Sequence, residues 1–367
     1  MISLLAIFIV FLYGMFLLWC YLQWISVPEK AGETAQACTS VSVILAARNE
    51  SQNILNVLGD LAGQDFPQNN FEVIICDDHS EDDTYTKSQD FISSHQLPWK
   101  IIHCIGTGKK NALSEGIQKS SNPLILITDA DIRLGNDWIK SITQEYCEHK
   151  PTMICGPVQA EGSGFFGKLQ MAELAGLAGI SASGIFANRP MMCNGANMAF
   201  EREAYHRISG FKGSTHASGD DTQLLQKISS IQQGSIRFIK DRKSIVRTKV
   251  HNRIMDWFFQ RRRWASKITT LSVTTILTAA LAWITHALLL IQLIILPLKG
   301  SYMLLLLLLS MKVLPEYVFL QSVGRFFNQQ FSLLFLLVCQ PFYCLYIALT
   351  GLLAGIGNQV WKGRTVK

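Results

Sequence analysis

Two carboxylates separated by a single residue follow an apolar run near the middle of the chain. Asp129 and Asp131 flank Ala130, directly after the run Leu124 to Thr128. Hard carboxylate oxygens suit Mg²⁺ or Mn²⁺, and such an ion would bridge the diphosphate of a nucleotide sugar and neutralise it as it leaves. Because this spacing is common by chance, its position after a strand-like run is what favours a metal site here.

Asp77 and Asp78 follow another strand-like run and offer a second acidic site. A carboxylate there can accept hydrogen bonds from a base or a ribose, and Asp78 is the better candidate of the pair. Ser80, Asp82 and Asp83 come next, and they are better explained as the cap and the acidic first turn of the following helix.

Gly219-Asp220-Asp221 precedes a helical pattern, Thr222 to Ser229, and allows two interpretations. One carboxylate would act as a general base that takes a proton from an acceptor hydroxyl as it attacks an anomeric carbon. A single displacement at that carbon inverts its configuration. Alternatively, the acidic pair caps the helix and interacts favourably with its dipole.

A basic and aromatic segment, Gln260-Arg261-Arg262-Arg263-Trp264, lies just before a long apolar run. Arginine and tryptophan are common at membrane boundaries, so we expect Arg261 and Arg262 to anchor the chain there. Gln260 and Trp264 share one helical face, which would line an acceptor site. Arg263 would then stabilise the leaving diphosphate.

The elements that position these side chains follow from an alternation of strand and helix patterns. Short β-branched runs predict strands at Val41 to Ala46, Phe71 to Cys76, Lys100 to Cys104 and Leu124 to Thr128. Helical patterns lie between them at Glu50 to Ala62, Asp82 to Ser94 and Lys110 to Lys119. We therefore predict an α/β fold with a mostly parallel, Rossmann-like sheet and helices on both faces.

In open sheets of this kind, ligands bind beyond the carboxyl ends of the strands. The turn Ala47-Arg48-Asn49-Glu50 follows the first predicted strand, Asp77 follows the second and Asp129 follows the fourth. We expect these polar turns to converge on one edge of the sheet. Further along, Phe165 to Ala187 is helix-like and rich in small residues, which indicates a close-packing face or, alternatively, an element that lines an acceptor site or touches a membrane.

Membrane-length apolar segments flank the α/β region. Only 16% of the residues are charged, whereas roughly 25% is usual in soluble domains. Roughly 20 apolar residues of helix cross a bilayer, and three segments have that length: Ile2 to Trp24, Ile268 to Leu296 and Phe331 to Gly355. Tyr302 to Leu320 contains Lys312, Pro315 and Glu316, so it crosses, lies in the interface or re-enters. We therefore divide the chain into an anchor (1–28), an α/β domain (38–267), a hydrophobic region (268–357) and a basic tail (358–367).

Cysteine usage and charge indicate the compartment and exclude one class of partner. The nine cysteines form no CxxC pair and several lie in apolar runs, which favours reduced, buried thiols and a cytosolic domain. The formal net charge is +6, yet no basic tract with interleaved aromatic residues indicates a nucleic-acid partner. Anionic lipid headgroups explain the basic cluster Arg261 to Arg263 better.

Taken together, the motifs resemble those of glycosyltransferase family 2 in order and spacing. They are Ala47-Arg48-Asn49-Glu50, Asp77-Asp78-x-Ser80-x-Asp82, Asp129-x-Asp131, Gly195-Ala196-Asn197, Gly219-Asp220-Asp221 and Gln260-x-x-Arg263-Trp264. The likeness covers about Val41 to Lys267, and the last motif is similar to the signature of cellulose, chitin and hyaluronan synthases and of ceramide glucosyltransferase. The sequence departs from the family at His79, where glycine is usual, and at Asp220, where glutamate is commoner.

The resemblance implies a GT-A fold, a nucleoside-diphosphate sugar donor that is commonly UDP-linked, and Mg²⁺ or Mn²⁺ held mainly by Asp131. It also implies Asp221 as the catalytic base. The implied donor contacts are Ala47, Arg48, Asn49, Glu50, Asp78, Asp129, Ala130 and either Lys110 or its neighbour Lys109. The residues implied to hold acceptor and diphosphate are Asp220, Gln260, Arg263 and Trp264.

The small number of apolar segments favours one kind of acceptor. Polymerising synthases thread their product through a channel of many helices, whereas three or four segments favour transfer of one sugar to a lipid acceptor. A polysaccharide synthase is the alternative, and a transporter or passive scaffold is disfavoured because ionisable residues concentrate outside the apolar segments.

The donor determines the expected orientation in the membrane. Nucleotide sugars are cytosolic, so we expect a multi-pass protein of the cell membrane with its N-terminus outside and its catalytic domain in the cytosol. The basic tail is also expected in the cytosol, which requires an even number of crossings after the α/β domain.

Overall fold

Two compact units make up the computed structural model. The structure describes residues 2–30, 38–212, 220–231, 234–267, 271–356, 359–361 and 364–366. The helical unit comprises Met1–Ser26, Gly162–Met191 and Val250–Gln359, and the α/β unit comprises Val27–Glu161, Met192–Lys249 and Val360–Lys367. Parts of the predicted 38–267 domain therefore belong to the helical unit, namely residues 162–191 and 250–267.

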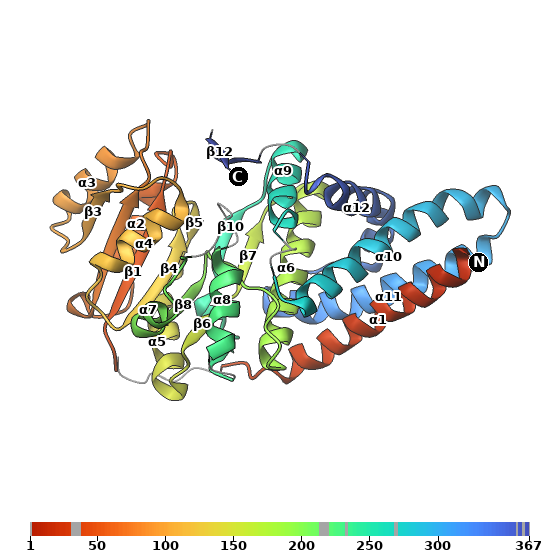
Figure 1. Cartoon of the computed structure of the whole chain (residues 1–367), viewed down its shortest axis with the longest axis horizontal. Coiled ribbons are helices and arrows are strands. Elements are labelled where there is room, and N and C mark those ends of the chain that lie inside the picture. Colours follow the sequence, from red (N-terminus) through yellow and green to blue (C-terminus); the bar gives the residue numbers. More distant parts are fainter. Residues whose placement is uncertain are drawn as a thin grey trace. The chain divides into compact units, whose positions relative to one another are not determined.

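A seven-stranded sheet forms the centre of the α/β unit (Figure 1). Its strands in spatial order are β3 (Lys100–His103), β2 (Phe71–Asp77), β1 (Val41–Ala47), β4 (Leu124–Asp129), β8 (Met198–Glu201), β6 (Met153–Cys155) and β9 (Ile236–Phe238). Strand β8 runs antiparallel to β4 and β6, and the other neighbours are parallel. The predicted α/β fold with a mostly parallel sheet is confirmed, and each of the predicted strands is present with its end shifted by a single residue.

Helices and a smaller sheet complete this unit. The helices are α2 (Ile54–Ala62), α3 (Thr84–Ser94), α4 (Lys109–Lys119), α5 (Trp138–His149), α7 (Arg202–Arg207) and α8 (Asp220–Ile231), with short 3-10 helices at Gln68–Asn70 and Arg242–Ser244. The smaller sheet has the order β5 (Ile132–Arg133), β10 (Val246–Lys249) and β7 (Val158–Glu161). Helix α3 begins later than predicted because the carboxylate of Asp82 accepts hydrogen bonds from the backbone amides of Ser51, at 3.1 Å, and Thr84, at 3.0 Å.

Helix α4 packs very closely on the parallel strands. A Cβ atom at Gly116 would lie 2.5 Å from Sγ of Cys76 and 2.6 Å from Cγ2 of Ile44. Side chains larger than hydrogen do not fit at such distances, so glycine permits this approach of the helix to β1 and β2. The contact fixes α4, whose first residue is Lys109, against the strands that end at the polar edge.

A disulfide joins Cys38, just before β1, to Cys147 on α5, with Cα atoms 6.0 Å apart. The prediction of reduced thiols is wrong for this pair, because 109 positions separate the partners and spacing does not reveal which distant cysteines meet in a fold. The other cysteines keep buried thiols, as predicted.

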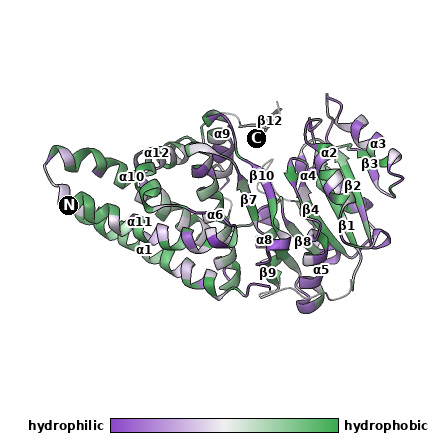
Figure 2. Ribbon diagram, turned by 180° about the vertical axis from the view of Figure 1, so that it is seen from behind, coloured by the Kyte–Doolittle hydropathy of each residue, from purple (hydrophilic) through white to green (hydrophobic). Residues whose placement is uncertain are grey.

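The helical unit is built from long apolar helices (Figure 2). Within the described ranges it contains α1 (Ile2–Ser26), α6 (Gly164–Phe186), α9 (Ile254–Ala265), α10 (Val273–Leu298), α11 (Tyr302–Phe326) and α12 (Leu333–Leu353). Five helices in the described part of the chain, α1, α6, α10, α11 and α12, are long and apolar enough to cross a membrane. The segment Tyr302 to Leu320 belongs to one continuous helix, α11, which runs through Pro315. Near the C-terminus, β11 (Gln359–Trp361) pairs with β12 (Arg364–Val366).

Helices α1, α10 and α11 lie side by side along their lengths. Near one end, the rings of Trp24 and Phe326 lie 5.6 Å apart. In the middle, the hydroxyl of Tyr13 donates to Glu316 at 3.0 Å, and the ring of His286 lies 5.7 Å from that of Tyr13. Towards the other end, apolar residues of the same three helices form one buried cluster together with Cys344 of α12.

Helix α6 has the length of a membrane span, but the strand pairing gives it a different path. Strands β6 and β7 precede α6, and they pair with β8 and β10, which follow it. Both ends of α6 therefore lead into paired strands of the α/β unit. The predicted close packing is present, since a Cβ atom at Gly179 would lie 2.6 Å from Phe319 and 2.7 Å from Val323 of α11.

Candidate functional site

The carboxyl ends of three parallel strands meet at one edge of the sheet. Ala47 lies opposite Asp77 in the pair β1 and β2, and Ala46 lies opposite Asp129 in the pair β1 and β4. The polar turns after these strands therefore begin at the same level, which is the convergence that the sequence predicts.

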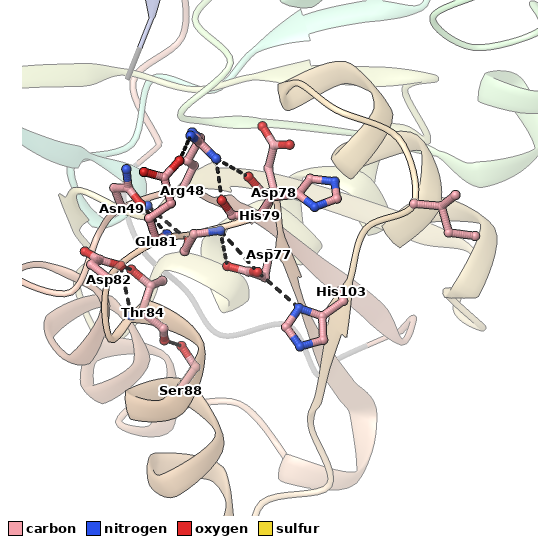
Figure 3. Close-up of polar contacts among 12 residues, drawn as sticks. Arg48, Asn49, Asp77, Asp78, His79, Glu81, Asp82, Thr84, Ser88 and His103 are labelled. Carbon is pink, nitrogen blue, oxygen red and sulfur yellow. Dashed lines mark hydrogen bonds and ion pairs between the residues drawn. The ribbon is translucent and has the colours of Figure 1, made fainter. Parts of the chain in front are cut away.

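Arg48 closes the turn after β2. The side chain is buried, and its Nη1 donates hydrogen bonds to the backbone carbonyl oxygens of Asp78, at 3.0 Å, and of His79 (Figure 3). Its Nη2 donates to the carboxylate of Glu81 at 2.8 Å. Arg48, predicted as a donor contact, therefore shapes the loop that carries Asp78.

The residues after Arg48 bind the same loop. The backbone amide of Asn49 donates to Oγ of Ser80 at 3.1 Å, and its side-chain oxygen accepts from the Glu81 amide at 2.8 Å. The backbone amide of Glu50, a buried residue, donates to Oγ1 of Thr84 at 2.7 Å. The turns after β1 and β2 thus form one hydrogen-bonded structure.

Asp78 and Asp129 are held close together by consecutive residues of the loop before α4. Asp78 is fully buried, and its Oδ1 accepts a hydrogen bond from the amide of Gly108 at 2.9 Å. Gly108 has a φ of 95°, which glycine adopts without strain. The next residue, Lys109, forms an ion pair with Asp129. The structure thus brings Lys109 to this carboxylate, while Lys110 follows it on α4.

His79 stands where glycine is usual in the family that the motifs resemble, and the backbone explains the preference. Its φ is 54°, in the left-handed region that glycine adopts freely and histidine tolerates better than branched residues do. The neighbouring Asp77 is buried, and its Oδ2 lies 3.3 Å from Nδ1 of His103 (Figure 3). The His103 ring stacks on that of Tyr85. The substitution at His79 is therefore compatible with the loop.

The Asp-Ala-Asp motif presents one carboxylate to solvent. Ala130 is buried, Asp129 is partly exposed beside Lys109, and Asp131 is exposed. An accessible carboxylate just beyond a strand end fits the oxygen-rich coordination of Mg²⁺ or Mn²⁺, which usually keep several water ligands. Asp131 is therefore the residue of this motif that best fits a metal.

A second acidic group lies at the end of α5. Among the described residues, Glu145, Glu148 and His149 have ligand atoms near enough together to hold an ion. Lys30 lies 3.8 Å from Glu145 and 3.6 Å from Glu148, and Arg237 lies 2.5 Å from Glu145. Because these cations already neutralise the carboxylates, the group fits a metal less well than Asp131.

Asp221 is joined to the end of β4 through the segment that precedes β8. Its Oδ2 accepts a hydrogen bond from the amide of Gly195 at 2.9 Å. The carbonyl oxygen of the next residue, Ala196, accepts from Oγ1 of Thr128 at 2.8 Å, and Thr128 directly precedes Asp129. The carboxylate of Asp221 therefore lies near the Asp-Ala-Asp motif, although 90 positions separate Asp221 from Asp131 in the sequence.

The capping interpretation of the second acidic pair also has a basis in the structure. Oδ1 of Asp221 accepts a hydrogen bond from the Thr222 amide at 2.7 Å, in the first turn of α8. Asp221 lies within α8 rather than before it, so this is a contact inside the first turn. One carboxylate oxygen is thus bonded to the Thr222 amide and the other to the Gly195 amide. Gly219 and the side chain of Asp220 lie outside the described residues.

The thiol of Cys193 lies near Asp221. A hydrogen bond with Cys155, burial and the negative charge of Asp221 raise the pKa of the Cys193 thiol well above its usual value. This thiol therefore stays protonated at neutral pH and does not compete with Asp221 as a base.

Asn197 has a structural role that the sequence analysis does not assign. It is buried, and its Nδ2 donates to the backbone carbonyl oxygens of Pro157 and Ser244, both at 2.8 Å. Its Oδ1 accepts from Nε1 of Trp138 at 3.0 Å. Asn197 thus fixes the segment that presents the Gly195 amide to Asp221, and the only signal for it in the sequence is its place in the Gly195-Ala196-Asn197 motif.

Gln260, Arg263 and Trp264 lie on α9 and belong to the helical unit, whereas the acidic residues above belong to the α/β unit. Trp264 is exposed. The prediction that Arg261 is a surface anchor is wrong, because its side chain is buried and its Nε donates to the carboxylate of Glu173 at 2.7 Å.

Known proteins resemble this chain in sequence. Residues 42–209 match the family model of glycosyl transferase family 2. The poly-beta-1,6-N-acetyl-D-glucosamine synthase of Staphylococcus epidermidis is 29% identical over 146 residues, which cover 39% of this chain and 35% of that protein. The beta-monoglucosyldiacylglycerol synthase of Trichormus variabilis is 26% identical over 144 residues, which cover 37% of this chain and 30% of that protein. The chain thus spans about a third of the length of these curated relatives.

The fold resembles that of a solved enzyme. The mannosyltransferase PcManGT from Pyrobaculum calidifontis, in complex with GDP-Man and Mn2+, has a TM-score of 0.59 and 17% sequence identity, and the match covers 96% of this chain and 99% of that chain. The GT-A fold that the resemblance implies is confirmed by this likeness.

Proposed function

Since the chain carries a glycosyltransferase family 2 domain at residues 42–209, we propose that it is an inverting, membrane-bound enzyme that moves a sugar from a nucleoside-diphosphate donor to a lipid or lipid-linked acceptor. The observation that carries the proposal is the set of contacts that joins Asp78, Asp129 and Asp221 at one edge of the sheet. At this edge, carboxylates from distant parts of the sequence lie close enough together to act on one donor and one acceptor.

The donor is assigned to the turns after β1, β2 and β4. Ala47, Arg48, Asn49, Glu50 and Asp78 would hold the nucleoside, and Lys109 or Lys110, Asp129 and Ala130 would lie along the diphosphate. Asp131 would hold Mg²⁺ or Mn²⁺, which neutralises the diphosphate when bound. The GDP-Man and Mn2+ complex of PcManGT supports a nucleotide-sugar donor and a divalent metal, and a UDP-linked sugar is the commoner donor in the family.

Asp221 is assigned as the general base. Its carboxylate, oriented by the Gly195 amide, takes the proton of the acceptor hydroxyl as that oxygen bonds to the anomeric carbon. The bond from this carbon to the diphosphate oxygen breaks on the opposite face, so the configuration inverts. The residues assigned to the acceptor and the departing diphosphate are Asp220, Gln260, Arg263 and Trp264.

The apolar helices support a lipid acceptor and a place in the cell membrane. The name of the Trichormus variabilis relative supports a glycolipid product, whereas that of the Staphylococcus epidermidis relative supports the alternative, a polysaccharide synthase. We place the α/β unit in the cytosol with its donor. We place the basic tail in the cytosol as well, which requires an even number of crossings among α10, α11 and α12.

Product analysis tests the proposal. Proteoliposomes that contain the full chain are incubated with Mn²⁺ and a panel of UDP- and GDP-sugars, and the lipid extract is examined by mass spectrometry. One donor should yield a lipid that carries one added sugar, and Asp221→Asn should lower kcat about 10²- to 10⁴-fold, the usual contribution of a general base. Asp90→Asn, a change at an exposed residue of α3, should leave kcat unchanged.

The outcomes are distinct. A radiolabelled product of polymer size would support the synthase alternative. No transfer from any donor by the folded protein, or an unchanged kcat in Asp221→Asn, would overturn the assignment.

A further inference from the structure

One buried carboxylate joins three helices of the helical unit. Glu173 lies on α6, and its Oε2 accepts hydrogen bonds from Nε1 of Trp257, at 3.0 Å, and from Nε of Arg261, at 2.7 Å, both on α9. Its Oε1 accepts from the hydroxyl of Tyr346 on α12 at 3.1 Å. Both oxygens of one side chain therefore hold neighbouring helices in place.

The surroundings of Glu173 exclude water. Its side chain is 7% exposed, Trp257 is 0% exposed, and Tyr346 is 5% exposed. The Trp257 ring stacks on that of Tyr346 at 3.9 Å and meets the ring of Phe166 edge-on at 5.4 Å. A carboxylate in such a place is stable only with a charged partner and satisfied hydrogen bonds, and Arg261 supplies the charge.

Arg261, which is held by Glu173, also contacts the motif residues Gln260 and Trp264. Its Nη1 donates to the side-chain oxygen of Gln260, and its guanidinium lies 4.1 Å from the ring centre of Trp264. Because a guanidinium is planar, the hydrogen bond from Nε to Glu173 also limits the directions in which the Nη atoms can donate. The orientation of both motif side chains thus depends on the ion pair behind them.

We propose that Glu173 is a positioning residue, which acts through Arg261 to orient Gln260 and Trp264 for the acceptor. The inference rests on the proposed function, in which these two residues bind the acceptor. Arg261 and Arg263 then have different roles. Arg261 contacts protein groups and holds α9, whereas Arg263 is assigned to the departing diphosphate.

The test compares acceptor kinetics with donor binding in the full chain. Glu173→Gln keeps the size of the side chain but removes its charge, so the kcat/KM for the acceptor lipid should fall about 10- to 100-fold, the equivalent of one charged hydrogen bond. UDP affinity, measured by calorimetry, should fall less than the acceptor kcat/KM, because the residues assigned to the nucleoside belong to the other unit and Arg263 is the diphosphate residue on α9. Tyr346→Phe, which removes only the α12 contact, should keep the acceptor kcat/KM within about threefold.

A double variant separates positioning from general damage. If Glu173 acts through Arg261, Glu173→Gln with Arg261→Gln should be no worse than the more impaired single variant. Additive losses, an acceptor kcat/KM in Glu173→Gln within twofold of the unmodified chain, or an equal loss of UDP affinity would overturn the inference.

Hydrogen exchange gives a readout that needs no activity. In Glu173→Gln, the backbone amides of α9 should exchange faster, because the ion pair between Glu173 and Arg261 holds this helix. The exchange of the α4 amides should not change, because α4 takes no part in that ion pair. Absence of any transfer by the unmodified chain would sink the proposed function, whereas unaltered exchange of α9 would sink the positioning role of Glu173.

Discussion

Replacement of Arg48 by methionine would remove the guanidinium that closes the loop after β2. Arg48 is 4% exposed and donates to the carbonyl oxygens of Asp78 and His79 and to the carboxylate of Glu81. Methionine fills a similar apolar volume but donates no hydrogen bond. The Arg48→Met variant therefore loses the three contacts with little change in packing.

The burial of each acceptor sets the size of the effect. Each carbonyl oxygen loses a charged donor, at about 1.5–3 kcal/mol. The side chain of Glu81 is 78% exposed, and an ion pair to so exposed a group contributes at most about 1 kcal/mol. We expect Arg48→Met to lower the free energy of unfolding by about 3–6 kcal/mol, and Glu81→Gln to lower it by less than about 1 kcal/mol.

Chemical unfolding and UDP calorimetry on the purified full chain check this expectation. The loss of unfolding free energy in Arg48→Lys should lie between the losses in Arg48→Met and Glu81→Gln. The reason is that an ammonium lacks the planar fork that reaches both carbonyl oxygens. If the guanidinium instead bound the donor diphosphate directly, Arg48→Met would weaken UDP binding at unchanged stability. That result, or equal destabilisation by Glu81→Gln and Arg48→Met, would refute the reasoning.

Three further changes have definite expected outcomes. Asp131→Asn should abolish the activation of transfer by Mn²⁺ after treatment with EDTA, whereas an unaltered metal titration would exclude Asp131 as the ligand. Lys312→Met leaves the buried carboxylate of Glu316 without its cation, so stability in detergent should fall by about 3–5 kcal/mol, and adding Glu316→Gln should recover most of the loss. Burial raises the pKa of Glu72, but hydrogen bonds, the first from the Ser121 amide, outweigh it and hold the pKa at about 2. The stabilisation is therefore complete above the unfolded value of about 4.3 and is lost as the pH falls towards 2, so Glu72→Gln should flatten the acid limb of a stability curve.

The parallel half of the sheet and the carboxyl edge could be predicted from the sequence. β1, β2 and β4 are mostly apolar runs that end at polar turns, which is the pattern of strands buried on both faces. Since parallel strands present their carboxyl ends on one side, the convergence of Ala47, Asp77 and Asp129 follows from the strand order. Local pattern therefore determines this part of the site.

The other half of the sheet has no such local signal. β6 and β9 have three residues each and β8 has four, too few for any periodicity to appear. β8 also enters antiparallel between β4 and β6. The contact of Gly195 with Asp221 depends on that insertion. The residue pattern indicated the Asp220–Asp221 pair, and only the resemblance to a family selected Asp221 from it.

Long-range partners also explain the errors about Arg261 and the cysteines. Arg261 precedes an apolar run, which favours a surface anchor, but its partner Glu173 is 88 positions away. Cys38 and Cys147 are likewise distant in sequence. In each case the environment of the residue is created by tertiary packing, which the neighbouring sequence does not encode.

Polar contacts on two sides of α12 determine how that helix can support α9. In lipid, apolar helix faces contact lipid tails as well as one another, so apolar packing alone selects no register. Gln340 bonds Lys312 and Glu316 of α11, and Tyr346, six positions further, bonds Glu173 of α6. Six positions correspond to different faces of a helix, so α12 can neither rotate nor slide without breaking a buried polar contact. Because the Trp257 ring of α9 stacks on Tyr346, a change at Lys312 of α11 should loosen α9 through α12.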